Sequence, residues 1–334
     1  MSTTRRDLFR LLLGALGCHP GWANSGAAGE QLRQYRADAV VTLLSIPIVT
    51  RQGVGSGYAS LRQEGADNNR RLCLRFAAGS WPKEAHGLNR LGYIEEVVEE
   101  QGEQLCRAGY FGFMTSSDEQ SVDEARKALH RNGVAAVPYS TILGQSEPGT
   151  YFATKTRFQS EDGYTWSDWS ELLPKARLAV DSNDATVLAN ERRPDGSGVA
   201  APFLYSLWRA ITAPASDQEL RYAWGECDYA LRVEKKPDSS MGSKLADKLL
   251  TQHPSRVVRL AGKARNLKSG KQSKFRFWYE EGASSLLPLR IEYRPRSFLH
   301  LIFEADPAIT LTPPPEQASR LWSAPARTAM RGDD

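Results

Sequence analysis

The segment Leu287–Arg294, with the sequence LPLRIEYR, shows the pattern that decides the fold. Two kinds of side chain alternate along it: apolar Leu289, Ile291 and Tyr293, and charged Arg290, Glu292 and Arg294. Because successive side chains of a β-strand point to opposite faces, this alternation predicts a strand with the apolar set inside and the two arginines in water. One solvated face is typical of antiparallel sheets.

More strands are expected on both sides of this segment, each bounded by turn residues. The C-terminal end should form four strands, at Arg256–Ala264, Lys274–Glu280, Leu287–Arg294 and Phe298–Phe303. The N-terminal part should form antiparallel strands over 35–76, with turns at 53–57 and 64–69. Hairpins are expected at 92–115, 134–159 and 220–233.

Short helices are expected where apolar residues recur every three or four positions. They lie at 116–133, 166–180, 202–211 and 241–253, and the last should have Leu245, Leu249 and Leu250 on its apolar side. The polar stretch Asn183–Ala200 is expected to be a loop. Together these elements predict an α+β fold in which several short helices accompany a large antiparallel sheet.

Residues 1–28 resemble a twin-arginine export signal. The segment Thr4–Arg10 carries the arginine pair, and the short apolar segment Leu11–Gly17 is followed by small residues. This order of a basic start, an apolar middle and a small-residue end is typical of signal peptides, with cleavage after Ala23, Ala27 or Ala28. We therefore expect a periplasmic protein.

Two domain boundaries follow from this interpretation. A single β-rich domain is expected over 29–306, and a Pro-containing disordered tail over 307–334.

Cysteine usage leaves two questions open. Leu16-Gly17-Cys18 is a partial lipobox, so acylation of Cys18 would make the protein a lipoprotein, whereas an unmodified Cys18 would leave with the signal. The other cysteines are Cys73, Cys106 and Cys227. Their odd number allows at most one internal disulfide, whose pairing the sequence does not decide, and three buried thiols are the alternative.

Composition and motifs exclude several functional classes. The chain has 334 residues, of which 41% are hydrophobic and 25% charged, and its net charge of +4 argues against a dedicated nucleic-acid binder. The run Leu11–Gly17 is far shorter than the roughly 20 residues of a transmembrane helix, so no membrane span is expected. We find no haem, iron–sulfur, zinc-knuckle or nucleophile-elbow motif, and therefore expect no cofactor, metal or catalytic residue. Gly53, Gly55 and Gly57 lack the spacing of a nucleotide loop and favour a strand bend.

A basic region covers the C-terminal strands. Residues 256–296 contain eleven basic and three acidic side chains. Lys274, Arg276, Arg290 and Arg294 form the candidate face for an anionic ligand, such as lipid head groups or another envelope polyanion. The alternative is a solvated face that is balanced by the acidic stretch Glu95–Glu103.

Three tryptophans, Trp208, Trp224 and Trp278, are candidates for lining an apolar ligand cavity. Packing in the core is the other common use of tryptophan.

Several segments resemble an uncharacterised family of exported bacterial β-rich proteins. Tyr222–Leu231 is similar to that family's W-D-G-x-R-x-Y-D-L strand-turn-strand, with Glu226 in place of the Asp-Gly order. Phe277–Tyr279 and Leu287–Glu292 are similar to its closing W and L-P-V-R-I-E strands, and residues 46–57 to its opening strands. The resemblance implies a curved sheet, a half-barrel or open barrel-like structure similar in outline to lipid-carrying half-barrels.

Two functions are compatible with these observations. The absence of a catalytic motif favours a non-enzymatic envelope protein that binds a lipid, another apolar ligand or an envelope partner protein. The alternative is a cofactor-free periplasmic hydrolase acting on envelope polysaccharide, which would need two carboxylates about 5–10 Å apart in a polar cleft.

Overall fold

The computed structural model describes residues 29–43, 46–66, 68–85, 90–115, 137–160, 168–180, 186–192, 198–213, 219–296 and 299–311. The expected signal with Cys18, the expected helix at 116–133 and residues 312–334 of the expected tail lie outside this part of the chain.

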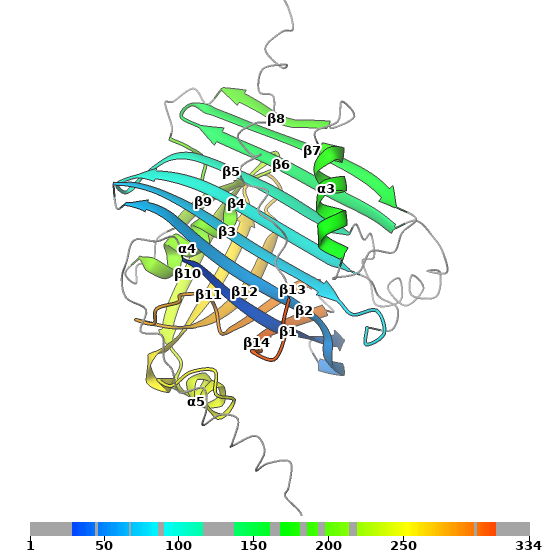
Figure 1. Ribbon diagram of the computed structural model, residues 1–334, viewed down its shortest axis with the longest axis vertical. Helices are drawn as coiled ribbons and strands as arrows, with labels where there is room; N and C mark the ends of the chain where they lie inside the picture. Colours follow the sequence, from blue (N-terminus) through cyan, green and yellow to red (C-terminus); the bar gives the residue numbers. More distant parts are fainter. Residues whose placement is uncertain are drawn as a thin grey trace, which may run out of the picture.

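One antiparallel sheet of fourteen strands makes up most of the described structure (Figure 1). Its first eight strands are β1 (Glu30–Leu43), β2 (Ile46–Ala66), β3 (Asn69–Ser80), β4 (Leu91–Gln101), β5 (Gln104–Thr115), β6 (Val137–Glu147), β7 (Thr150–Ser160) and β8 (Thr186–Arg192). The other six are β9 (Glu219–Trp224), β10 (Cys227–Pro237), β11 (Val257–Asn266), β12 (Gln272–Glu280), β13 (Arg290–Arg296) and β14 (Leu299–Ala305).

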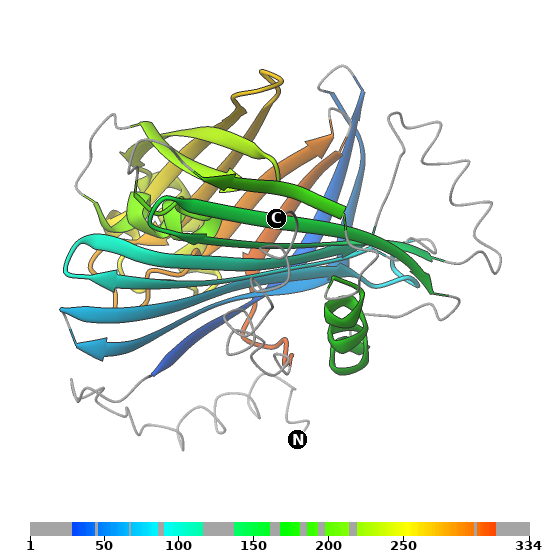
Figure 2. The ribbon, with the colours of Figure 1, turned by 90° about the horizontal axis from the view of Figure 1, so that it is seen from above.

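The strand order makes the first and last strands neighbours. β1–β8 and β9–β14 each run as a meander, and β1 pairs with β14 to join the two. The free edges are therefore β8 and β9, in the middle of the chain. The sheet curves strongly without closing (Figure 2), so the expectation of a curved antiparallel sheet with a few short helices is confirmed.

Hydrogen bonds from two tyrosine side chains, rather than a strand ladder, connect the β9 end of the sheet to its N-terminal half. The backbone N–H of Gly225 donates to the Tyr110 hydroxyl over 2.6 Å, and the Tyr151 hydroxyl donates to the Gly225 carbonyl over 2.7 Å. Gly225 has a φ of 61°, which a glycine adopts without strain. These bonds hold the β9–β10 turn against β5 and β7.

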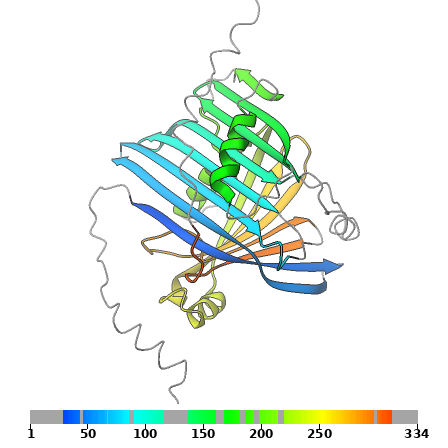
Figure 3. The ribbon, with the colours of Figure 1, turned by 45° about the vertical axis from the view of Figure 1, so that its right-hand side comes forward.

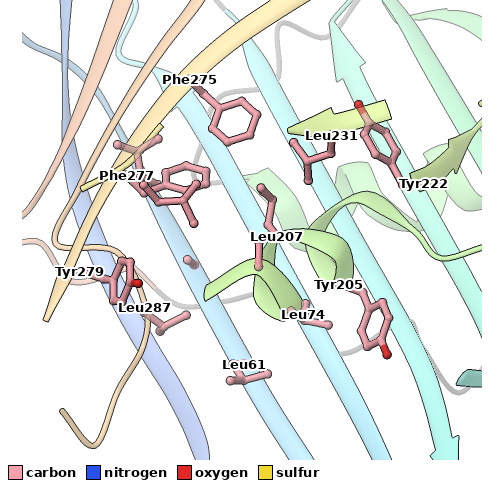
Figure 4. Close-up of a cluster of buried hydrophobic side chains, with 14 of the residues drawn as sticks. Leu61, Leu74, Tyr205, Leu207, Tyr222, Leu231, Phe275, Phe277, Tyr279 and Leu287 are labelled. Atoms are coloured by element: carbon pink, nitrogen blue, oxygen red, sulfur yellow. The ribbon is translucent and has the colours of Figure 1, made fainter. Parts of the chain in front are cut away.

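The concave face encloses the main core, which includes helix α4 (Phe203–Thr212). Figure 4 shows this helix between the two halves of the sheet, with Leu207 and Tyr205 among side chains from β2, β3 and β12. Pro202 precedes the helix as its N-cap, close to the expected first-turn position. The space inside the curved sheet is thus filled by a helix and by aromatic and aliphatic side chains.

A second core lies on the convex face of the N-terminal half. Helix α3 (Trp169–Val180) packs there, and its Leu172 and Leu173 are fully buried among Tyr93, Phe111 and other residues of β4–β6 (Figure 3). The expected helix over 166–180 is confirmed. Leu311 also packs against this core, and the Leu311 carbonyl accepts a hydrogen bond from Gln34.

Helix α5 (Ser239–Asp247) covers the outer side of the sheet near the start of β11. Leu245 packs there against Val257, Trp278 and Leu289, and the 3₁₀ turn η2 (Pro254–Arg256) follows. None of the helices in the described ranges has the length and apolar character that crossing a bilayer requires.

Most expected hairpins and helices are confirmed, but several local expectations are wrong. The helix expected over 241–253 ends at Asp247, and Leu249, expected on its apolar side, is 90% exposed. Residues 183–200 are not all loop, because Thr186–Arg192 forms the edge strand β8. The glycines at 53–57 do not end a strand, because β2 runs through them. A Cβ on Gly55 would lie 2.2 Å from the Gly79 carbonyl oxygen of β3, so close backbone approach explains this glycine.

The alternation in the LPLRIEYR segment holds only in part. Ile291 is 7% exposed and lies between Phe277 and Phe303 in the main core. Leu289 is buried too, but in the cluster under α5, because β13 begins only at the next residue. Tyr293 pairs with core-facing Phe275, yet it is 38% exposed toward the end of its strand.

The expectation that Arg290 faces water is wrong. Its side chain is only 16% exposed, because it points to the side that α5 partly covers. The Arg290 guanidinium donates to Glu292 and, over 2.7 Å, to Glu304. It also lies 5.8 Å from the centre of the Trp278 ring. A long cation next to acids on two neighbouring strand positions is more stable in these bonds than extended into solvent.

Candidate anion-binding face

The outer face of the C-terminal strands carries a row of four cations. Arg232 on β10 is opposite Lys263 on β11, and Lys263 is opposite Lys274 on β12. On β13, Tyr293 is paired with Phe275 of β12. Because the strands are antiparallel, the next residue, Arg294, lies next to Lys274 and continues the row. We call Arg232, Lys263, Lys274 and Arg294 the cation row; at about 4.8 Å per strand it is about 14 Å long.

This arrangement is unfavourable for the folded protein by itself. Like charges directly opposite each other on paired strands repel, so Arg232 opposite Lys263 and Lys263 opposite Lys274 destabilise the ladder. An anion bound over the row would remove this repulsion.

The cation row lines an open hollow of about 740 Å³. Other charged or ionisable residues at its wall are Arg276, His300, Glu219, Glu234 and Glu292. The three acids are engaged with cations: Glu219 with Arg232 at 2.8 Å, Glu234 with Lys236, and Glu292 with Arg290 at 2.9 Å. Within the described part of the chain, no acidic side chain forms an ion pair with Lys263, Lys274 or Arg294. The hollow therefore presents three uncompensated positive charges.

His300 adds no positive charge to the hollow at neutral pH. Burial lowers its pKa below the ordinary value of 6.5, and the nearby arginines Arg294, Arg290 and Arg276 lower it further. Glu292, 3.6 Å from the imidazole, opposes this but does not outweigh it. A neutral imidazole can still donate one hydrogen bond to an anion.

Of the residues proposed from sequence for an anionic ligand, Lys274, Arg276 and Arg294 lie together at the hollow. Arg290 is not part of its lining, because Glu292 and Glu304 hold it. Arg232 and Lys263 were not singled out in the sequence. The signal that could have identified them is the register of the 220–233 hairpin and its neighbour, which brings their side chains opposite each other.

The three candidate tryptophans do not line a common cavity. Trp208 on α4 and Trp224 at the end of β9 contact the main core, and Trp224 also stacks at 4.6 Å on Tyr110, which belongs to a smaller buried cluster. Trp278 lies on the opposite face under α5, 3% exposed, and its indole N–H donates to Asp238 over 3.0 Å. These contacts are packing contacts.

Two carboxylates are buried on the concave face. Glu96 accepts the backbone N–H groups of Leu204 and Tyr205, each over 2.8 Å, and so satisfies the first turn of α4. Burial raises the pKa of Glu96 to about 8, although these backbone donors lower it. Glu100 instead binds Arg70 over 2.7 Å and lies 3.6 Å from Arg209. Both carboxylates thus hold internal elements, and neither lines the hollow.

The cysteines in the described residues are not joined in pairs. Cys73, Cys106 and Cys227 are free thiols, and only Cys73 is buried. Burial raises the pKa of Cys73 to about 12, so this thiol stays protonated. The proposed lipidation site at Cys18 lies outside the described ranges.

Comparisons with known proteins identify no family for this chain. No family model matches it, and no curated protein matches it. Among solved structures, it is similar to a beta-barrel-like protein of domain of unknown function DUF1849 from Brucella abortus, with 8% sequence identity and a TM-score of 0.40. The similarity covers 84% of this chain and 98% of that one. Since so low a similarity carries no argument, the resemblance in the sequence motifs stays a prediction.

Proposed function

We propose that this is an exported, non-enzymatic envelope protein that binds the phosphate-bearing head groups of anionic lipids through the cation row. The observation that carries the proposal is that Lys263, Lys274 and Arg294 line one hollow without acidic partners in the described part of the chain. Negative charge attracted to such a surface is worth about 1 kcal/mol per basic residue near a bilayer.

The size of the row favours a surface with repeated charges over a single small anion. It crosses four strands, so a single phosphate would contact only part of it. A leaflet of anionic lipid offers several phosphates at once, and several moderate contacts add up to a useful affinity.

The apolar-ligand alternative has less support. The concave side holds α4 and packed aromatic rings rather than an open apolar space, and two of the three candidate tryptophans contact this packing. The hydrolase alternative would need carboxylates that face a cleft, whereas Glu219, Glu234 and Glu292 at the hollow are engaged with cations.

Vesicle cosedimentation at low salt tests the lipid contact. Vesicles that contain an anionic phospholipid should bind the wild type, and vesicles of neutral phosphatidylcholine should not. The double variant Lys263→Glu/Lys274→Glu should lose most of this binding, because two attractive charges become repulsive. Its matched control is Lys268→Glu/Lys271→Glu, which makes the same change in net charge on the exposed β11–β12 turn.

The control decides between a site and a general charge effect. Strong loss in the first variant and weak loss in the second supports the cation row. Equal loss in both variants, or equal binding by all three proteins, would contradict it.

Export is the second part of the proposal, supported by the twin-arginine pattern at Thr4–Arg10. Replacing Arg5 and Arg6 with Lys should leave the precursor in the cytoplasm, as fractionation and blotting would show. An unchanged periplasmic yield would contradict export by this route.

A further inference from the structure

The turn after α5 contains a leucine with an unusual backbone conformation. Leu249 has a φ of 61°, and it is the only non-glycine residue with positive φ in the described ranges. Its side chain is 90% exposed. The turn is well formed, because the N–H of Leu249 donates to Ala246 over 2.8 Å and that of Leu250 donates to Leu245 over 2.9 Å.

These two bonds define a Schellman ending, in which the residue with left-handed backbone is usually glycine. A side chain with a Cβ is strained there, and an apolar side chain in water is unfavourable as well. Leu250 and Leu245 pack together as this motif expects, but Leu249 points away from them into solvent. At 90% exposure, packing within the described residues offsets little of this cost, which favours a role for Leu249 in contacts outside the folded chain.

The position of Leu249 relates it to the cation row. Helix α5 packs on Trp278 of β12. Trp278 lies four residues after Lys274, so both side chains point to the same face, and the two positions are about 14 Å apart along the strand. Figures 1 and 3 show α5 at one end of the C-terminal strands. Exposed Lys244 and half-exposed Lys248 lie on and after α5 near the leucine, although Lys248 is paired with Glu304 and the exposed Asp247 lies beside them. An apolar tip on an element that packs beside the basic face matches the polarity and charge of an anionic bilayer surface.

We propose that Leu249 inserts into the interface of an anionic bilayer while the cation row contacts its head groups. The inference rests on the proposed function and adds an apolar anchor to it. The anchor contributes affinity that salt does not screen, whereas the contribution of the row weakens as salt rises.

Vesicle cosedimentation over a salt series separates the two contributions. Leu249→Asn keeps a residue that tolerates left-handed backbone but removes the apolar tip. We expect its partition into anionic vesicles to fall about tenfold at every salt concentration, with an unchanged salt dependence. The matched control is Leu178→Asn on α3, where the leucine is 74% exposed outside the C-terminal face, and it should bind like the wild type.

Melting temperatures accompany the binding data, because a folding defect could also lower binding. Leu249→Asn should melt no lower than the wild type, since strain is relieved. Wild-type binding by Leu249→Asn, or an equal loss in Leu178→Asn, overturns the anchor while binding that depends on Lys263 and Lys274 still stands. Absence of any wild-type binding to anionic vesicles overturns the proposed function and the anchor together.

Discussion

The strands β3–β6 and the strands β10–β13 belong to one sheet but use their outer faces differently. On β4 and β5, Tyr93, Val97 and Phe111 face outward and are buried, because α3 covers them. On β10 and β12, outward-facing Arg232 and Arg276 are 75% and 57% exposed. An outer face of this sheet is thus buried as core where a helix packs on it and stays exposed and charged where no helix does.

The burial pattern along the strands also differs between the two regions. The strand β4 buries four residues in succession, Glu95–Val98, as a strand with both faces covered does. The strand β12 alternates strictly between buried and exposed from Lys274 to Phe277.

The largest effect should come from breaking the outer core. Leu172→Ala on α3 should lower the free energy of unfolding by about 2–5 kcal/mol, because Leu172 is fully buried between the helix and the sheet. Urea unfolding measures this, with exposed Leu178→Ala on the same helix as control. A loss below about 0.5 kcal/mol would mean that α3 does not pack on the sheet as described.

The next effect concerns the concave face and depends on pH. The pKa of Glu96 is about 8 in the folded protein, above the ordinary carboxyl value of 4.5, so the folded state keeps a proton that the unfolded chain has released. Its contribution to stability is complete below about pH 4.5 and is lost as the pH rises through about 8.

Glu96→Gln removes this titration from the same position. Between pH 6 and pH 8, the wild type should lose about 2 kcal/mol relative to the variant. Tyr110 and Tyr222 interact electrostatically with Glu96, but burial raises the pKa of both hydroxyls, so they stay neutral over this range and do not mask the change. Unfolding titrations at several pH values check it, and parallel curves for both proteins would contradict it.

A smaller loss of stability should follow from Arg290→Ala, because this side chain lies on the outer face of the sheet next to α5. The truncation leaves Glu304, whose side chain is 9% exposed, with Lys248 as its remaining cation, and it uncovers Trp278. We expect a destabilisation of about 1–3 kcal/mol. Arg276→Ala is the control, since Arg276 is 57% exposed, and equal values for both would place Arg290 in solvent after all.

The smallest effect belongs to the cation row. Lys274→Ala should change the free energy of unfolding by no more than about 0.5 kcal/mol, with a sign toward stabilisation, because repulsion from Lys263 is removed. Thermal melting at low salt measures it best, since salt screens the repulsion. A marked destabilisation would mean that Lys274 makes a contact that stabilises the fold, which would contradict its place in the proposed ligand-binding row.

Local patterns predicted much of the fold and part of the candidate site. Alternation identified the closing strands, and the hairpins expected at 92–115, 134–159 and 220–233 were placed correctly, with their turns at Gly102, Gly149 and Gly225. Lys274, Arg276 and Arg294 were also identified as candidates. The edge strand at Thr186–Arg192 was missed because its short apolar run lies in a mostly polar stretch over 183–200 and it pairs with only one neighbour, β7.

By itself, the sequence determined most of the strands, the turns of three hairpins and that the C-terminal strands have a charged face. Only the tertiary structure decided that β1 pairs with β14, that α3 covers one outer face and that Arg232 and Lys263 join Lys274 in a row. It also decided that Arg290 is engaged with Glu304 and that Leu249 is exposed on a strained turn. The physical reason is that strand formation depends on near neighbours along the chain, whereas pairing, register and the packing of helices depend on contacts between residues far apart in sequence.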